Sequence, residues 1–248
     1  MTSPAPLTRE VSRTPSNDAA RWARDPYPDY IAEVNRSIAF AGAEQSFFTA
    51  GKAKRAIDIL QTQGLNPAAM SLLDIGCGVG LIHPYLASRF KDVVGVDVSA
   101  EALASARANN PSNLYWQYDG VRLPFADQCF DAAIAICVMH HVPPPKWGGF
   151  VAEARRILRP GGMLMIFEHN PWNPLTRLAV SRCAFDYDAV LLSPSQSTRL
   201  LRQGGFVSVG REFLFFTPFP AAPIQRAEQA LRWCPAGAQY VAMGRRAS

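Results

Sequence analysis

The sequence predicts an α/β fold in which a parallel sheet is covered on both faces by helices. Short apolar runs of strand length alternate along most of the chain with segments of helical periodicity, a pattern typical of parallel sheets. A glycine-rich turn links the first buried run, 71–75, to the helical segment after it. The chain has 248 residues, 48% of them hydrophobic, which is enough to bury the core of one large domain.

The first 66 residues divide into two parts. Residues 1–25 are rich in Pro, Ser, Thr and Arg and show no apolar period, so they predict a flexible tail. Residues 26–66 predict a helical cap, because two apolar stripes recur at helical spacing and Gly64 closes the second. The stripes are Tyr30, Ile31, Val34 and Ile38, then Ala53, Ala56, Ile57 and Leu60.

Strands and helices alternate through the remaining domain, residues 67–248. The expected strands are 71–75, 93–98, 114–118, 132–138, 163–167, 206–216 and 239–245. One helix is expected from near Leu81 to Arg89, and a second follows strand 93–98 and ends at Asn109. Three more are expected over 150–158, 195–203 and 224–233. The polar, proline-rich stretch after Glu168 carries no helical prediction.

Composition excludes several classes of protein. The longest apolar run, 132–139, is far shorter than the ~20 residues that cross a bilayer, and the N-terminus has no apolar core of a secretory signal. Five cysteines without a CxxC pair favour reduced thiols and a cytoplasmic location. The net charge of +5 comes from arginines dispersed over 199–248, so nucleic-acid binding is not expected.

The most informative stretch is the glycine-rich turn 74–80, Asp-Ile-Gly-Cys-Gly-Val-Gly. Its third glycine, Gly80, comes one position too early for a dinucleotide fingerprint, and Leu81 stands in the expected place. Asp74 would repel a phosphate but suits a cationic ligand such as an amino group. The alternative interpretation is a structural turn capped by Asp74.

Two further carboxylates follow neighbouring strands. Asp97 ends the strand about twenty residues after the first glycine, where an acid accepts both hydroxyls of a ribose. Ser99 is the better helix cap, so Asp97 is expected to be free for a ligand. Asp119 and Gly120 follow the next strand and face the same crevice, where Asp119 suits the exocyclic amine of a purine.

Taken together, these motifs resemble class I S-adenosylmethionine-dependent methyltransferases, in their small-molecule branch. The matching segments are 74–80, 93–99, 119–142 and 154–166. The resemblance implies a Rossmann-like, mostly parallel seven-stranded sheet in the order 3-2-1-4-5-7-6, with the last strand antiparallel. It implies S-adenosyl-L-methionine as cofactor and S-adenosyl-L-homocysteine as product.

The resemblance also implies the residues that line the cofactor. They are Asp74, Gly76, Cys77, Gly78, Gly80, Asp97, Val98, Asp119, Gly120 and Cys137. Asp74 would lie near the methionine amino group, Asp97 at the ribose, and Asp119 with Gly120 at the adenine. Cys137, at the end of the fourth strand, would pass close to the methionine moiety.

The candidate catalytic residues are His140, His141, Glu168 and His169. A neutral imidazole suits the removal of a proton from an O or N acceptor, and His140 is favoured within the pair. The alternative is catalysis by proximity and orientation alone. No metal is expected, because Mg²⁺ prefers oxygen ligands and three imidazoles would suit zinc or iron instead.

The predicted function is methyl transfer to an O or N, with C left open, of a small molecule such as a natural product, sugar or quinone-like or lipid-like intermediate. Two regions are expected to shape its pocket, the N-terminal helices as a lid and the segment after Glu168. The apolar stretch 213–219 leaves contact with a membrane surface open. The alternatives are an NAD(P)-dependent oxidoreductase and a non-catalytic or RNA-directed S-adenosylmethionine-binding protein.

Overall fold

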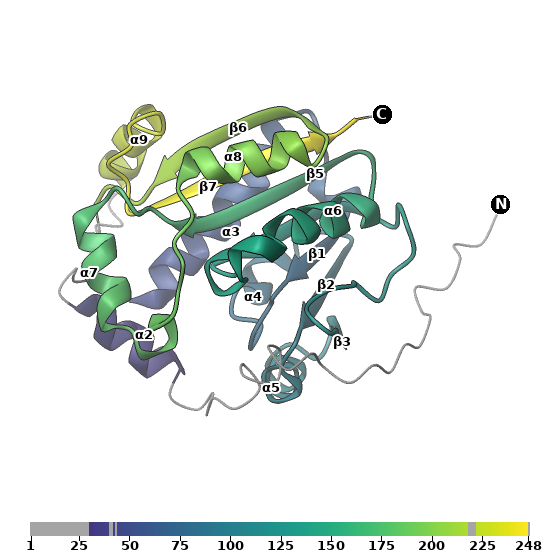
Figure 1. The fold of residues 1–248 in the computed structure, drawn as a ribbon, viewed down its shortest axis with the longest axis horizontal. Coiled ribbons are helices and arrows are strands. Elements are labelled where there is room, and N and C mark those ends of the chain that lie inside the picture. The colour runs from purple at the N-terminus through teal and green to yellow at the C-terminus, as the bar shows by residue number, and fades with distance from the viewer. Residues whose placement is uncertain (1–29, 40–41, 43, 218–221, 248) are drawn as a thin grey trace.

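The computed structural model describes residues 30–39, 42, 44–217 and 222–247 (Figure 1). Its sheet has the strand order β3-β2-β1-β4-β5-β7-β6. The strands are β1 Ser71–Ile75, β2 Asp92–Asp97, β3 Leu114–Gln117, β4 Phe130–Ile136, β5 Leu158–His169, β6 Phe206–Leu214 and β7 Gln239–Arg246. β7 pairs antiparallel with β5 and β6, while the pairs from β3 to β5 are parallel. The implied strand order and the antiparallel last strand are confirmed.

Helices connect these strands. The α-helices of the described residues are α2 Tyr30–Ile38, α3 Gln45–Thr62, α4 His83–Leu86, α5 Ala100–Asn109, α6 Trp147–Ile157, α7 Pro174–Arg182, α8 Pro194–Gln203 and α9 Ala222–Ala230. Single 3₁₀ turns are η3 Pro67–Ala69, η4 Met139–His141, η5 Pro144–Lys146 and η6 Ala184–Asp186. The predicted tail, 1–25, lies outside the described residues.

The sheet buries a separate core on each face. Along β5, Leu164 and Ile166 belong to the core that includes residues of α6 and α8, whereas Met165 and Phe167 belong to the core that includes residues of α3 and α4. Successive side chains of a strand point to opposite faces, so the apolar runs of the central strands serve both cores. Figure 1 shows α6 and α8 on the near face of the sheet and α3 behind it.

Two helical segments differ most from the sequence prediction, and β5 is longer than the expected strand 163–167, because it begins at Leu158. The helix expected from Leu81 to Arg89 is one turn only, with turns on either side. The stretch after Glu168, which has no helical prediction, contains α7. The Asn173 side chain accepts hydrogen bonds from the N–H groups of Leu175 and Thr176, and Pro174 occupies the first turn, where its missing N–H costs nothing. One of the prolines that suggested irregular structure, Pro174, therefore begins a helix.

In the parts of the chain that the structure describes, no helix is both long and apolar enough to cross a bilayer. All five cysteines lie within these parts and are free thiols. The cytoplasmic location stays a prediction.

Candidate active site

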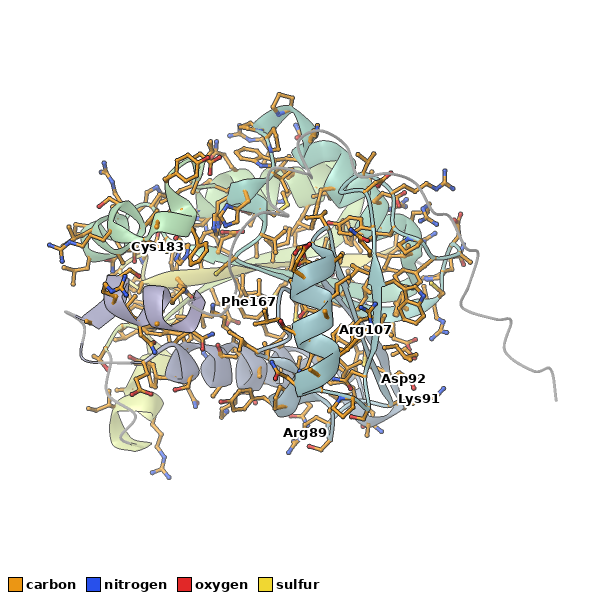
Figure 2. The ribbon with its side chains drawn as sticks, turned by 90° about the horizontal axis from the view of Figure 1, so that it is seen from below. Arg89, Lys91, Asp92, Arg107, Phe167 and Cys183 are labelled. Carbon is orange, nitrogen blue, oxygen red and sulfur yellow. The ribbon has the colours of Figure 1, made fainter. Side chains whose placement is uncertain are left out.

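A cavity of about 640 Å³ lies at the carboxyl ends of the central strands. Its walls come from the glycine-rich turn, the ends of β2, β4 and β6, and the helices α2, α3 and α7. Figure 2 shows Cys183, one of its lining residues, on the opposite side of the molecule from Arg89, Lys91 and Asp92. The strand ends at which the sequence predicts polar groups therefore meet at one site.

Two of the three glycines in the turn, Gly78 and Gly80, have different roles. Gly78 has a φ of 53°, lines the cavity, and would place a Cβ in open space with no atom within 4 Å. A ligand can therefore approach its backbone closely. Gly80, with a φ of 73°, is not on the cavity wall: its Cβ would lie 2.9 Å from Asn110 Nδ2. Gly80 allows the turn to pack against α5 and β3, which differs from its predicted place in the cofactor site.

Asp74 is buried with one oxygen unsatisfied. It is 2% exposed, and its Oδ2 lies 3.1 Å from His83 Nε2, while Oδ1 has no hydrogen-bond partner in the described structure. The other ring nitrogen, His83 Nδ1, lies 2.6 Å from the Tyr115 hydroxyl, so the ring is fixed on both sides. An unpaired buried carboxylate oxygen is costly, and a cationic group in the cavity would satisfy it.

The sequence analysis expected Asp97 to be free for a ligand. In the structure, backbone N–H groups hold its carboxylate. Its Oδ2 accepts the N–H of Gly78 at 2.8 Å and its Oδ1 accepts the N–H of Ser99 at 3.0 Å. Burial raises the pKa of the carboxyl, and these two hydrogen bonds oppose the rise. Each carboxylate oxygen has a second lone pair, so Asp97 still accepts from ligand hydroxyls.

The other residues predicted for the cofactor lie around the same cavity. Gly76, Cys77, Val98, Asp119, Gly120 and Cys137 all line it. Asp119 Oδ1 accepts the N–H groups of Val121 and Arg122, and this fixes the turn that follows β3. Apart from Gly80, the structure thus brings the predicted cofactor residues together.

Cys137 lies next to two cationic or ionisable groups at the end of β4. Its φ is 55°, unusual for a residue with a side chain, and Lys52 Nζ lies 3.5 Å from its Sγ. Burial alone would raise the pKa of the thiol, but Lys52 and the hydrogen-bonded His169 lower it to about 7. The sequence analysis missed Lys52, although its position four residues from both Phe48 and Ala56 in an apolar stripe marked it as a buried charge.

His140 and Glu168 form a buried pair. Glu168 Oε2 lies 2.5 Å from His140 Nδ1, and Oε1 accepts the N–H groups of Val138 and Met139. Glu168 does not line the cavity, so it positions His140 and is not placed to contact an acceptor as the sequence predicted. Burial alone would lower the pKa of His140, but Glu168 and Asp186 raise it well above its usual range, which favours a proton-holding role over the predicted base.

Asp186 completes this group and was not predicted. Its Oδ1 lies 3.4 Å from His140 Nε2 and 3.5 Å from His141 Nε2, and all three residues line the cavity. Burial and the neighbouring His140 lower the pKa of His141 to about 4. The carboxylate comes from η6, more than forty residues after the histidine pair, so no local spacing in the sequence signals the contact.

Known proteins share this fold and these motifs. The family model described as "Methyltransferase domain" matches residues 73–166. An uncharacterized methyltransferase of Synechocystis sp. is 32% identical over 154 residues, which cover 60% of this chain and 72% of that protein. A demethylmenaquinone methyltransferase of Beutenbergia cavernae is 35% identical over 109 residues, 43% of this chain and 45% of that protein.

A solved structure of an S-adenosylmethionine-dependent methyltransferase from Thermotoga maritima, described as a possible histamine N-methyltransferase, shares the fold. Its TM-score is 0.59 at 20% identity, covering 81% of this chain and 92% of that one. The chain belongs to the S-adenosylmethionine-dependent methyltransferase family. It is therefore a methyltransferase enzyme and not the alternative oxidoreductase.

The cavity fits the family's methyl donor on two observations of this structure. The unpaired Asp74 Oδ1 matches the ammonium group of the donor's methionine part. The open space at Gly78, next to Asp97, leaves room for a ligand against the backbone. Carboxylates rather than phosphate-binding groups at these points suit a cationic, phosphate-free nucleoside.

Proposed function

We propose that the protein transfers a methyl group from S-adenosylmethionine to an oxygen or nitrogen of a small, largely apolar acceptor bound in this cavity. What supports the proposal is one cavity with two unlike walls. Carboxylates and glycines of the strand ends form the first wall, and apolar side chains of the helices and of the segment after β6 form the second. The apolar wall includes Val34, Ile38, Phe48, Leu175, Val180, Phe185, Phe215 and Phe216. A cavity of about 640 Å³ suits a small molecule.

The donor side binds through Asp74, Asp97 and the turn at Gly78. Asp74, oriented by His83, offers its free oxygen to an ammonium group, and Asp97, oriented by Gly78 and Ser99, accepts from hydroxyls. Asp119 and Gly120 line the same cavity, as does Val98, and we assign them to the purine. When bound, the donor supplies an electrophilic methyl group on a positively charged sulfur.

The N-terminal helices act as a cap in this proposal. Val34, Ser37 and Ile38 of α2 and Gln45, Phe48 and Lys52 of α3 line the cavity. In Figure 1, α2 and α7 lie together at one end of the molecule, where they close the apolar wall. Such a cap excludes water and holds the acceptor in line with the methyl group of the donor. This orientation lowers the activation barrier by several kcal/mol, out of the roughly 7–11 kcal/mol that orientation can supply.

The acceptor is proposed to be a quinone-like or natural-product-like molecule. The apolar wall supports a ring or chain without charge, and relatives include proteins named demethylmenaquinone methyltransferase and, from Penicillium expansum, an O-methyltransferase 31% identical to this chain. His141 and His169 line the cavity and offer polar groups to an acceptor atom.

Isotope transfer tests the proposal. The full chain is incubated with methyl-labelled S-adenosylmethionine and a panel of demethylquinones, phenols and amines, and in parallel reactions with RNA and with protein, and products are identified by mass spectrometry. We expect label in an O-methyl or N-methyl product of an apolar member. Label found only in nucleic acid or protein, with none of the small molecules methylated, would contradict the proposal.

A further inference from the structure

We propose that His140, His141 and Asp186 form a binding site for one divalent transition-metal ion of the Zn²⁺ type on the acceptor side of the cavity. The ligand atoms of these residues all lie within 4.8 Å of one another. They are two imidazole nitrogens and one carboxylate oxygen, a set that zinc sites commonly use. The sequence analysis expected no metal, because Mg²⁺ prefers oxygen ligands, and it did not consider Asp186.

The distances around Asp186 fit an ion better than a hydrogen bond. Asp186 Oδ1 lies 3.4 Å from His140 Nε2 and 3.5 Å from His141 Nε2. Good N–H···O bonds measure about 2.7–3.2 Å, so both contacts are long for a shared proton. Two ligands of a tetrahedral ion with bonds of about 2.0–2.1 Å stand about 3.3–3.4 Å apart. The spacing of the oxygen from each nitrogen is therefore that of neighbouring ligands.

The arrangement behind His140 is that of a metal ligand. Its Nδ1 lies 2.5 Å from Glu168 Oε2, and Glu168 is itself held by the N–H groups of Val138 and Met139. A metal ion at Nε2 would replace the proton that Glu168 and Asp186 stabilise there, because a ligating imidazole must be neutral. With Nδ1–H donating to Glu168, the Nε2 lone pair is then presented to the ion, and such supporting carboxylates are usual in zinc sites. Glu168 and Asp186 together also carry the two negative charges that balance a divalent cation.

The site has one ligand able to adjust. The His140 side chain is 1% exposed and fixed, whereas the His141 side chain is 25% exposed at the end of η4. To bring the two imidazoles to ligand spacing, the His141 side chain would therefore have to move, because His140 is fixed. An ion there would tie η4 to η6, two segments that both line the cavity.

The fourth position of such an ion faces the cavity. Because all three ligand residues line it, the open position would accept an oxygen of a bound molecule, such as a phenol or enol hydroxyl. This second part rests on the proposed function and narrows it to an oxygen acceptor. A bound Zn²⁺ would lower the pKa of such a hydroxyl, so that the hydroxyl gives up its proton to solvent. The resulting oxygen anion would then form the bond to the donor's methyl group as the bond from that methyl group to sulfur breaks.

Metal binding is tested on the full chain after treatment with a chelator and its removal. Zn²⁺ is titrated by calorimetry, and Co²⁺ by its visible spectrum, which is intense only for tetrahedral coordination. We expect one equivalent bound, with a tetrahedral Co²⁺ spectrum. Absence of binding, or an octahedral spectrum, overturns the proposal.

Three variants locate the ion. Asp186→Asn and His141→Ala should remove stoichiometric binding, and Glu168→Gln should weaken it by about 10–100-fold. Asp92→Asn is the matched control, since this exposed carboxylate lies on the opposite side of the molecule (Figure 2). S-adenosylhomocysteine binding confirms that each variant is folded. Variants that bind Zn²⁺ as the unaltered protein does would overturn the assignment.

The acceptor role is measured separately. With an accepted substrate in hand, chelation should lower the rate of O-methylation at least tenfold, and Zn²⁺ should restore it in the unaltered protein but not in Asp186→Asn. An unchanged rate after chelation overturns the acceptor role. Metal binding itself is measured without any acceptor, so failure of the proposed function and failure of the metal site are distinguished.

Discussion

The donor side of the cavity comes from the ends of three adjacent strands, whereas the acceptor side is assembled from segments spread between residues 34 and 217. On the donor side, neighbouring backbone groups hold Asp97 and the Asp119 turn, and a single imidazole holds Asp74. On the acceptor side His140 contacts Asp186, and between the two sides Cys137 contacts Lys52, in both cases across a long stretch of chain. The residues of the donor side can be predicted from the sequence because their contacts are local. The contacts of the acceptor side are not local, so they become visible only in the folded structure.

The largest expected effect is on Asp97. Asp97→Ala removes the carboxylate that accepts from ligand hydroxyls and from Gly78, so S-adenosylhomocysteine affinity should fall at least about 100-fold. Calorimetry measures the affinity, with Asp92→Asn as a control of unchanged affinity and circular dichroism as the check on folding. Tight binding of S-adenosylhomocysteine by a folded Asp97→Ala protein would contradict the assignment of Asp97 to the donor site.

Asp74 should matter for one part of the ligand only. Asp74→Asn loses the charge that faces the ammonium group, and we expect a drop in S-adenosylhomocysteine affinity of about 10–100-fold. 5′-Methylthioadenosine, which lacks the amino-acid part, should bind the variant and the unaltered protein equally. An equal loss for both ligands would mean that Asp74 supports the fold and does not contact the ligand.

Cys137 marks the border between the two sides, and its reactivity should depend on pH. The thiolate displaces iodide from iodoacetamide, so alkylation of Cys137 should rise with pH around a midpoint of about 7 and then level off. Lys52→Met removes the ammonium that favours the thiolate, so the midpoint moves up and the rate at pH 7 falls about tenfold. Peptide mass spectrometry follows the residue.

Two outcomes of this labelling contradict the placement of Cys137. One is a midpoint near 9 in the unaltered protein, the ordinary value for a thiol. The other is an alkylation rate that S-adenosylhomocysteine does not slow, because a ligand on the donor side should shield the sulfur.

Gly78 and Gly80 separate binding from stability. A left-handed alanine costs about 1–2 kcal/mol at either position, and at this chain length about 2–4 °C of melting temperature per kcal/mol. Gly80→Ala also meets Asn110 and should melt at the lower temperature, while Gly78→Ala should show the larger loss of S-adenosylhomocysteine affinity. Thermal melts and calorimetry on both variants check this, and the reverse order would contradict the two assignments.

The smallest effect tests the independence of the acceptor side. Leu175 of α7 lines the cavity but is 60% exposed. Leu175→Ser should therefore leave S-adenosylhomocysteine affinity within about twofold and change stability by about 0.5 kcal/mol or less. Calorimetry showing a tenfold loss would mean that the donor reaches α7 and that the two sides are not separate.

Much of the fold could be predicted because its signals are local. The apolar run 71–75 coincides with β1, and Ser99 caps α5 by accepting the N–H of Ala102, as its position suggested. β7 could be placed antiparallel only through the family resemblance, since periodicity does not state direction. α7 was missed because Pro174 stops a helix in most positions and starts one here.

The site was predictable to the same extent. Asp74, Gly78 and Asp97 lie within a few residues of strand ends, where the topology brings them together. Asp186 and Lys52 reach the cavity from η6 and α3, and their contacts depend on packing that one sequence does not reveal. Even His83, nine residues from Asp74, was not assigned, because a one-turn helix directs its ring inward.

A crystal structure of the protein with S-adenosylhomocysteine tests the central claim most directly. The account predicts the amino group of the ligand within hydrogen-bond distance of Asp74 Oδ1, its ribose hydroxyls on Asp97, and its sulfur turned toward Cys137 and the apolar wall. A ligand bound elsewhere, or one whose amino group leaves Asp74 Oδ1 unpaired, would contradict it.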